Sequence, residues 1–137
     1  MTPYQIELVQ TSFRKVAAIS ETAAELFYQR LFEIDPRLRS MFRSDMREQG
    51  KKLMDMLRLV VSNLATIERV VPIIGGLARR HEAYGVKDEH YRTVGQALID
   101  TLEKGLGKDF TADVCDAWLE AYSLLSRTMM GATANAR

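Results

Sequence analysis

His81 is one of only two histidines in the chain, and it closes the segment Leu77–His81. A neutral imidazole ligates a metal through one ring nitrogen while an acceptor holds the N–H of the other. A phenol, an aromatic ring and a side-chain amide precede it, at Tyr28, Phe42 and Gln49. The phenol and the amide can donate hydrogen bonds to a small ligand that carries negative charge. This is the set of side chains that a haem iron with an open coordination position needs.

Helices must position these side chains. Apolar residues recur at spacings of three and four, and no stretch alternates convincingly as a strand would. Capping residues mark the predicted starts, and proline or glycine marks several of the ends. The pattern predicts six substantial helices and one short one. The substantial helices run from Thr2 to about Ala18, from Ser20 to Asp35, from Asp45 past Leu64, from before Ile73 to near His81, from Asp88 to Gly105, and from Thr111 past Met129. The short one runs from Pro36 to Phe42.

Several local features follow from residue type. Thr2 is expected to form a capping box, and Ser20 to be the N-cap of the second helix. Gly75–Gly76 costs helix propensity, so we expect it to serve close packing. Gly85 is a natural left-handed helix stop. The small, polar tail 131–137 is expected to fray.

Composition places the chain among single-domain intracellular proteins. Its 137 residues are expected to form one domain, 1–137, and 47% of them are apolar. Nineteen basic against 18 acidic side chains favour neither nucleic acid nor an acidic membrane. The single cysteine, Cys115, suits a reducing cytoplasm. Neither a signal peptide nor an uncharged stretch of about 18 residues is present, so we expect no membrane span.

Five sets of residues match one known pattern in order and spacing. The matching distances are six residues from Pro36 to Phe42, 14 from Tyr28 to Phe42 and 32 from Gln49 to His81. Two further motifs are HYRTVGQ at His90–Gln96 and DAWLEAY at Asp116–Tyr122. With these motifs the chain resembles bacterial single-domain globins and the globin part of flavohaemoglobins, over roughly Phe13 to Met130.

The resemblance implies an all-α globin fold of six to seven helices around a haem. No Cys-x-x-Cys-His motif is present, so the haem would be non-covalent haem b. His81 would be the proximal iron ligand. Tyr28 and Gln49 would be distal donors that stabilise oxygen far more than CO, which predicts slow oxygen release. Read without the resemblance, Tyr28 is an ordinary core tyrosine and Gln49 a solvated side chain.

Other positions would line the haem, although ordinary core packing explains most of them too. Tyr91 would lie on the proximal side, and Lys52 and Arg80 could pair with the haem propionates or stay solvated. The expected apolar contacts are Leu77 under the porphyrin, Leu53 narrowing the ligand space, Phe42 stacking on the porphyrin, and Val86 and Val94 along its proximal and inner side.

The chain departs from flavohaemoglobins in two places. The segment between Phe42 and Gln49 is shorter, which bears on where Gln49 lies. Flavohaemoglobins also place a glutamate in the last helix that, with the tyrosine matching Tyr91, polarises the proximal histidine. The matching position is Thr133, so His81 should stay closer to neutral imidazole, which argues against strong peroxidase activity.

Several functions remain open at this point. The first is reversible binding of O2, NO or CO, with a five-coordinate ferrous state. The second is nitric oxide dioxygenase activity, which requires a separate ferric-haem reductase. A haem-based sensor and a helical module without haem are further readings. Tyr28 could also ligate ferric iron as a phenolate. We expect a monomer or a weak homodimer.

Overall fold

The computed structural model describes residues 1–42 and 45–136, with side chains up to Thr133. Helices and short connections make up this part of the chain, and no strand occurs within it. The elements, in order, are α1 (Pro3–Ala17), α2 (Ser20–Ile34), the 3-10 helix η1 (Pro36–Met41), α3 (Met46–Ser62), the 3-10 helix η2 (Leu64–Arg69), α4 (Val71–Ala83), α5 (Asp88–Leu106), the 3-10 helix η3 (Gly107–Asp109) and α6 (Ala112–Ala136).

Most predicted helix ends are confirmed by their hydrogen bonds. The Thr2 hydroxyl accepts from the Gln5 amide at 3.1 Å, and the Gln5 side chain accepts from the Thr2 amide at 3.0 Å. Asp45 caps α3 by accepting from the Arg47 amide at 3.0 Å. Gly85, at φ +95°, follows the end of α4 in the left-handed region, as predicted.

Three details differ from the expectations. Ser20 is the first residue of α2, and the N-cap is Ile19, which makes no side-chain capping bond. α6 continues to Ala136 instead of fraying from Gly131, and Thr133 is buried in this last turn. η2 was not predicted, because its six residues are too few to show a helical period.

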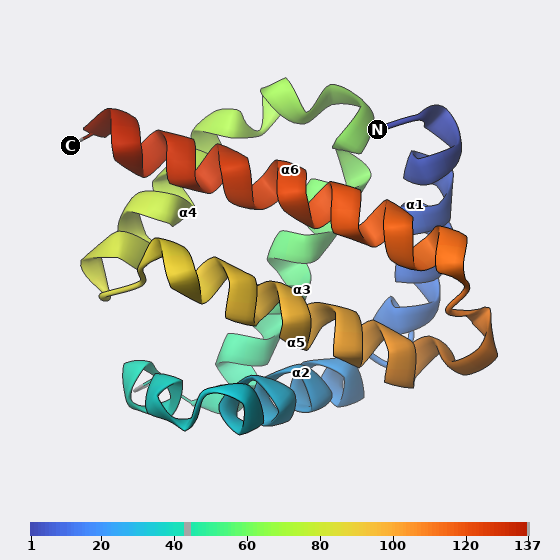
Figure 1. Cartoon of the computed structure of the whole chain (residues 1–137), viewed down its shortest axis with the longest axis horizontal. Coiled ribbons are helices and arrows are strands. Elements are labelled where there is room, and N and C mark those ends of the chain that lie inside the picture. Colours follow the sequence, from blue (N-terminus) through green and yellow to red (C-terminus); the bar gives the residue numbers. More distant parts are fainter. Residues whose placement is uncertain (43–44, 137) are drawn as a thin grey trace.

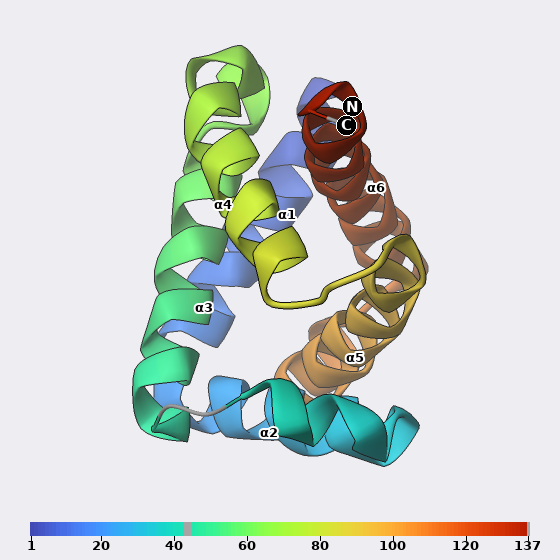
Figure 2. The same cartoon turned by 90° about the vertical axis from the view of Figure 1, so that its left-hand side faces the viewer.

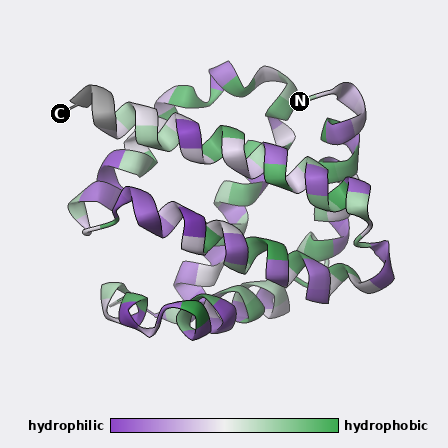
Figure 3. Cartoon of the chain, viewed as in Figure 1, coloured by the Kyte–Doolittle hydropathy of each residue, from purple (hydrophilic) through white to green (hydrophobic). Residues whose placement is uncertain are grey.

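α3 lies on one side of the molecule and α5 and α6 lie on the other, while α4 stands between them and packs against α6 (Figures 1 and 2). α2 lies across one end, where it packs against α5 and α3, and α1 packs against α6. Each helix carries both hydrophobic and hydrophilic residues (Figure 3). The apolar stripes meet in one core, whose most deeply buried large side chains are Val9, Leu31, Ile74 and Leu102.

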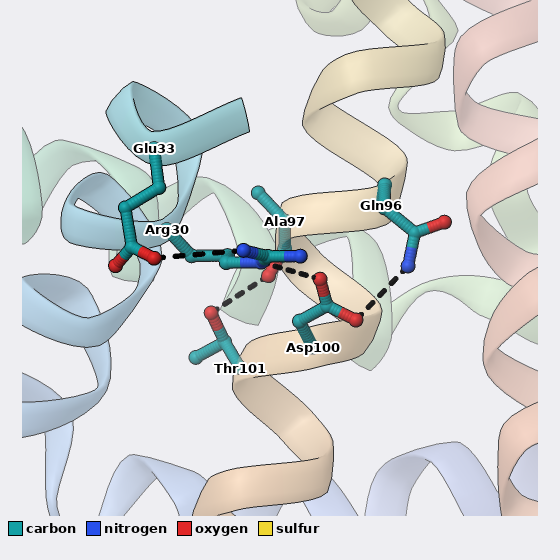
Figure 4. Close-up of polar contacts among 6 residues, drawn as sticks. All are labelled: Arg30, Glu33, Gln96, Ala97, Asp100 and Thr101. Atoms are coloured by element: carbon teal, nitrogen blue, oxygen red, sulfur yellow. Dashed lines mark hydrogen bonds and ion pairs between the residues drawn. The ribbon is translucent and has the colours of Figure 1, made fainter. Parts of the chain in front are cut away.

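A polar clamp joins α2 to α5 on the surface. The Arg30 guanidinium donates to Asp100 at 2.7 Å and lies 3.5 Å from Glu33 on its own helix. Gln96 donates to the other Asp100 oxygen at 2.9 Å, so this carboxylate is held from two sides (Figure 4). These bonds link α5 to α2, the helix that carries Tyr28.

Close helix packing occurs at glycines other than the predicted pair. A Cβ added at Gly75 would meet nothing nearer than 3.4 Å, which is an ordinary contact. A Cβ at Gly50 would lie 2.8 Å from the Cβ of Ala24, where α3 crosses α2. Gly75 does pack against α6, where the Ala132 Cβ lies 3.6 Å from the added Cβ, but an alanine would also fit there, so this contact does not require glycine.

A buried hydrogen bond ties α6 to α1. The Trp118 indole N–H donates to the Ser12 hydroxyl at 2.8 Å, and both residues are buried. Ser12→Ala leaves that N–H unpaired, so we expect the free energy of unfolding to fall by about 1–3 kcal/mol. Urea denaturation measures the loss, with Ser62→Ala at an exposed position as the control. Equal stability of the two variants would contradict the expectation.

Candidate functional site

His81 lies in the last turn of α4 and is half-buried. Its Nδ1 is 2.9 Å from the Leu77 carbonyl oxygen. A carbonyl only accepts, so Nδ1 must carry the proton, and Nε2 is left with its lone pair. Burial lowers the pKa of His81, the Leu77 carbonyl acts against that shift, and the Arg80 charge adds to it. The ring is therefore a neutral imidazole in the tautomer that can ligate a metal through Nε2.

The segment after His81 is folded back onto the end of α4. The Val86 amide donates to the His81 carbonyl at 3.0 Å, after the left-handed turn at Gly85. A Cβ at Gly85 would lie 3.9 Å from the terminal methyl of Met41, in η1. The α4–α5 connection thus lies beside the 3-10 helix that leads into Phe42.

Tyr28 is buried in α2 within a group of aromatic rings. Its ring centroid lies 5.1 Å from that of Phe27, 6.1 Å from Phe32 and 5.3 Å from Phe42. Burial raises the pKa of Tyr28 to about 12, so the phenol keeps its proton near neutral pH. The Tyr28 hydroxyl donates to the backbone carbonyl oxygen of Gln49 at 3.4 Å. This bond is long, so the hydroxyl can turn to a better acceptor.

Gln49 is half-buried in the first turn of α3, beside Tyr28. The two come together because α2 and α3 cross closely at Ala24 and Gly50, one turn before Tyr28 and next to Gln49. Sequence reasoning missed this role of Gly50, although its position beside Gln49 was a usable signal. The shortened segment before Gln49 includes residues 43–44, which lie outside the described residues.

The predicted lining residues are apolar or aromatic side chains that are only half-buried. α4 packs against α6 and η2 and stands between α3 and α5 in Figure 2. The lining residues on and between these elements are Phe42, Leu53, Leu77, Val86, Tyr91 and Val94. Each leaves part of its surface uncovered by the described part of the chain.

Two basic residues stand beside the half-buried groups. Lys52, three residues after Gln49, and Arg80, next to His81, are both exposed. Neither makes an ion pair with any residue that the structure describes. Each can therefore turn toward an acidic group at the edge of the site.

A tyrosine contact fixes the position of Tyr91. The Tyr122 hydroxyl of α6 donates to the Tyr91 carbonyl. The Tyr122 ring lies against Gly95, where an added Cβ would be 2.7 Å from Cε2. Burial raises the pKa of both tyrosines, with Asp88 and Glu82 adding to the shift at Tyr91. Gly95 and Tyr122 come from the two motifs HYRTVGQ and DAWLEAY, which thus meet in space.

The contact at Gly95 predicts a packing defect on substitution. Gly95→Ala should lower the free energy of unfolding by about 1–3 kcal/mol, because overpacking outweighs the gain in helix propensity. Gly131→Ala, with nothing within 4 Å, is the matched control and should be neutral or stabilising. Chemical denaturation of both variants measures the difference. A Gly95→Ala protein as stable as the control would refute the close contact.

Thr133, the residue expected to match the flavohaemoglobin glutamate, lies in the core. Thr133 is buried, and its hydroxyl donates to the Met130 carbonyl of the same helix at 3.0 Å.

In the described part of the chain, no three His, Cys, Asp or Glu side chains gather to hold a metal ion. Among the same residues, no helix is long and apolar enough to cross a membrane.

Comparison with known proteins gives a consistent result. The Globin family model matches residues 25–129. A flavohemoprotein of Deinococcus radiodurans is 30% identical over 134 residues, which cover 96% of this chain and 33% of that protein. The chain thus spans about a third of the length of the flavohemoproteins it matches.

Two solved structures have the same architecture. A bacterial globin from Campylobacter jejuni superposes with a TM-score of 0.87 over 98% of both chains, at 23% identity. An engineered carbene transferase, described as a candidate nitric oxide dioxygenase from Rhodothermus marinus, gives a TM-score of 0.89 at 26% identity. That superposition covers 99% of this chain and 95% of the other.

Proposed function

The chain belongs to the globin family, and from this premise we propose that it holds haem b non-covalently and binds a diatomic gas reversibly. Family membership implies a haem, whose ferrous iron supplies the open position for O2, NO or CO. The Nδ1–H of His81 bound to the Leu77 carbonyl is the observation that carries the proposal. This bond holds the ring so that Nε2 would be free to bind the iron.

The protonated phenol of Tyr28 and the side-chain amide of Gln49 would act as hydrogen-bond donors to the gas. The burial of Tyr28 supports this role, because a hydrogen bond shielded from water is stronger.

The remaining predicted residues would hold the porphyrin. Their half-buried side chains leave apolar surface that a haem would cover, and covering it stabilises the complex by roughly 25 cal/mol per Å2. Lys52 and Arg80 would pair with the propionates. The haem contacts proposed on this basis are Phe42, Leu53, Leu77, Val86, Tyr91 and Val94.

Absorption spectra of the protein mixed with haem test the proposal. A Soret band with a single broad ferrous visible band, which splits into two under oxygen, would support a five-coordinate, oxygen-binding haem. The ferrous CO form should give a further distinct spectrum. A spectrum unchanged from that of free haem would refute haem binding.

Nitric oxide dioxygenase activity is a second candidate, favoured by the similarity to a protein described in those terms and to flavohemoproteins. It would need a separate reductase to return ferric haem to the ferrous state. NO consumption with nitrate formation over many turnovers, in the presence of a reductant, would support it. If each haem consumed only one NO under the same conditions, sustained dioxygenase activity would be excluded and reversible gas binding would remain as the proposed function. We propose a cytoplasmic location and a monomer or weak homodimer for either function.

The pKa of Tyr28 predicts how gas release depends on pH. The folded-state pKa of about 12 lies above the ordinary value of 10.0, so the stabilising phenol form is fully present below pH 10. It is lost only as the pH rises toward about 12. The oxygen dissociation rate should therefore be constant between about pH 6 and pH 9. Stopped-flow measurements across this range check it, and a one-proton rise within the range would contradict it.

A further inference from the structure

α4 buries one side in the fold and leaves another side to solvent. Ile74 and Ala78, on its inner side, are fully buried. Pro72, Ile73 and Gly76 lie on a different side, because residues three or four apart share one face of a helix. Pro72 and Ile73 are exposed and Gly76 is half-buried. In Figure 2, α4 lies at the front of the molecule, toward the viewer. The helix therefore has an outer face that the described chain leaves open.

Large apolar side chains are exposed at both ends of this helix. Val71, its first residue, is 41% exposed and Ile73 is 48% exposed. Tyr84, the C-cap, is 69% exposed, more than any other large hydrophobic side chain in the described part of the chain. Apolar side chains that gather on one exposed surface indicate an interaction site, whereas scattered ones do not.

Two arginines lie between these ends and form no ion pair with any described residue. Arg79 and Arg80 are both exposed. Their side chains reach back along the helix, so that Arg79 Nη2 and Arg80 Nη1 lie 3.9 Å and 3.6 Å from where a Cβ at Gly76 would be. Arg79 Nη1 lies 3.4 Å from the corresponding point at Gly75, at the edge of the contact with α6. Two positive charges thus lie over the middle of the outer face.

The outer face differs in charge from the molecule as a whole. A net charge of only +1 predicted no attraction to an acidic membrane. Glu82 is the one acidic residue of α4, and it follows Ala78 by four residues, which places it toward the inner side. The outer face therefore combines apolar and basic side chains without an acid of its own helix. It is defined by Pro72, Ile73, Gly76, Arg79, Arg80 and Tyr84.

We propose that the outer face of α4 binds peripherally to the surface of an anionic lipid bilayer. The two arginines would pair with the phosphates of the lipid headgroups. Ile73 would enter the boundary between headgroups and acyl chains. Tyr84 would lie at the level of the headgroups, where its ring and its hydroxyl both find partners. The inference goes beyond gas binding and needs only the fold, although Arg80 is also a proposed propionate partner and is left unchanged in the tests below.

A second copy of the chain is a poorer occupant of this face. A two-fold contact uses the same patch on both molecules, so it would bring Arg79 and Arg80 of each copy together. Like charges that meet across an interface repel. An anionic surface neutralises the same charges while it accepts the apolar side chains beside them. Charge complementarity therefore favours the bilayer.

Co-sedimentation of the chain with lipid vesicles tests the proposal. Vesicles of about equal parts phosphatidylglycerol and phosphatidylcholine should bind it about 10-fold more tightly than vesicles of phosphatidylcholine alone, because only the former carry net charge. Raising the salt to about 0.5 M should remove most of this difference, because the attraction is screened. Equal binding to both kinds of vesicle, or binding to neither, would overturn the proposal.

Two substitutions locate the binding surface. Arg79→Glu should weaken binding to the anionic vesicles about 10-fold, and Ile73→Asn should weaken it about 5-fold. Lys104→Glu on α5 and Leu119→Asn on α6 are the matched controls, since Lys104 is exposed and Leu119 is 50% exposed. Neither control should change binding, and thermal midpoints check that all four variants are folded. Arg79→Gln is a milder second variant and should give a smaller loss. Effects of the controls equal to those of the α4 variants would overturn the proposal.

Two other occupants would each give a distinct result. If calorimetry shows that inorganic phosphate binds and that Arg79→Glu abolishes this binding, while vesicles do not bind, the arginines form a site for a small anion. If sedimentation without lipid shows a dimer that Ile73→Asn dissociates, a second copy covers this face. Either result would overturn the proposal.

Discussion

His81→Gly is expected to weaken haem binding by more than about 100-fold, because loss of a group that merely orients a metal ligand already costs 10–100-fold. The Soret band of the reconstituted protein should therefore be lost or shifted to that of unligated haem. Glycine removes the side chain and leaves a space beside Leu77 that free imidazole can enter. Added imidazole should restore the five-coordinate ferrous spectrum, which shows that the ligand itself was missing.

The other histidine is the matched control. His90 accepts a hydrogen bond from the Lys87 amide at 2.9 Å and serves the start of α5. His90→Gly should leave the spectrum unchanged while lowering the thermal midpoint. An unaltered Soret band in His81→Gly, or its loss in both variants, would rule out His81 as the proximal ligand.

Tyr28→Phe is expected to raise the oxygen dissociation rate about 10- to 100-fold. A hydrogen bond to a charged group contributes about 1.5–3 kcal/mol, and phenylalanine keeps the ring packing while removing the donor. Carbon monoxide gains little from such a donor, so its dissociation rate should change much less. Flash photolysis and stopped-flow measurements with both gases give the ratio.

Two comparisons make this result specific to the site. Tyr4→Phe removes an exposed phenol that donates to Asp113 at 3.3 Å, and should not alter either rate. Gln49→Leu should raise the oxygen rate in the same direction if the amide is the second donor. Equal acceleration for oxygen and CO in Tyr28→Phe would indicate a general loosening of the pocket instead of a lost hydrogen bond.

The globin fold expected from the resemblance is confirmed. Its helices were also predictable from the residues alone, because helical periods and caps are local signals. Thr2 and Asp45 cap as predicted, since each needs only neighbouring backbone groups. The close contacts at Gly50 and Gly95 were not predicted. They depend on which helix lies opposite, and that is decided by packing over the whole chain.

The candidate site was predicted residue by residue from its resemblance to globins. The structure adds relations that one sequence does not contain, such as the bond from His81 to the Leu77 carbonyl and the position of Tyr28 beside Gln49. The iron and the gas stay predictions. The sequence did not reveal that Tyr122 helps to position Tyr91. The Tyr122 hydroxyl donates to the backbone carbonyl of Tyr91, and a pattern of side chains does not predict such a bond.

The crossing of α2 and α3 has a consequence for how the chain can vary. Ala24 and Gly50 share one small volume, with 2.8 Å between the Ala24 Cβ and a Cβ built at Gly50. Selection at such a crossing acts on the summed size of two side chains, so a larger residue at one position requires a smaller one at the other. Positions 24 and 50 should therefore covary among related sequences, although neither is expected to touch haem or gas.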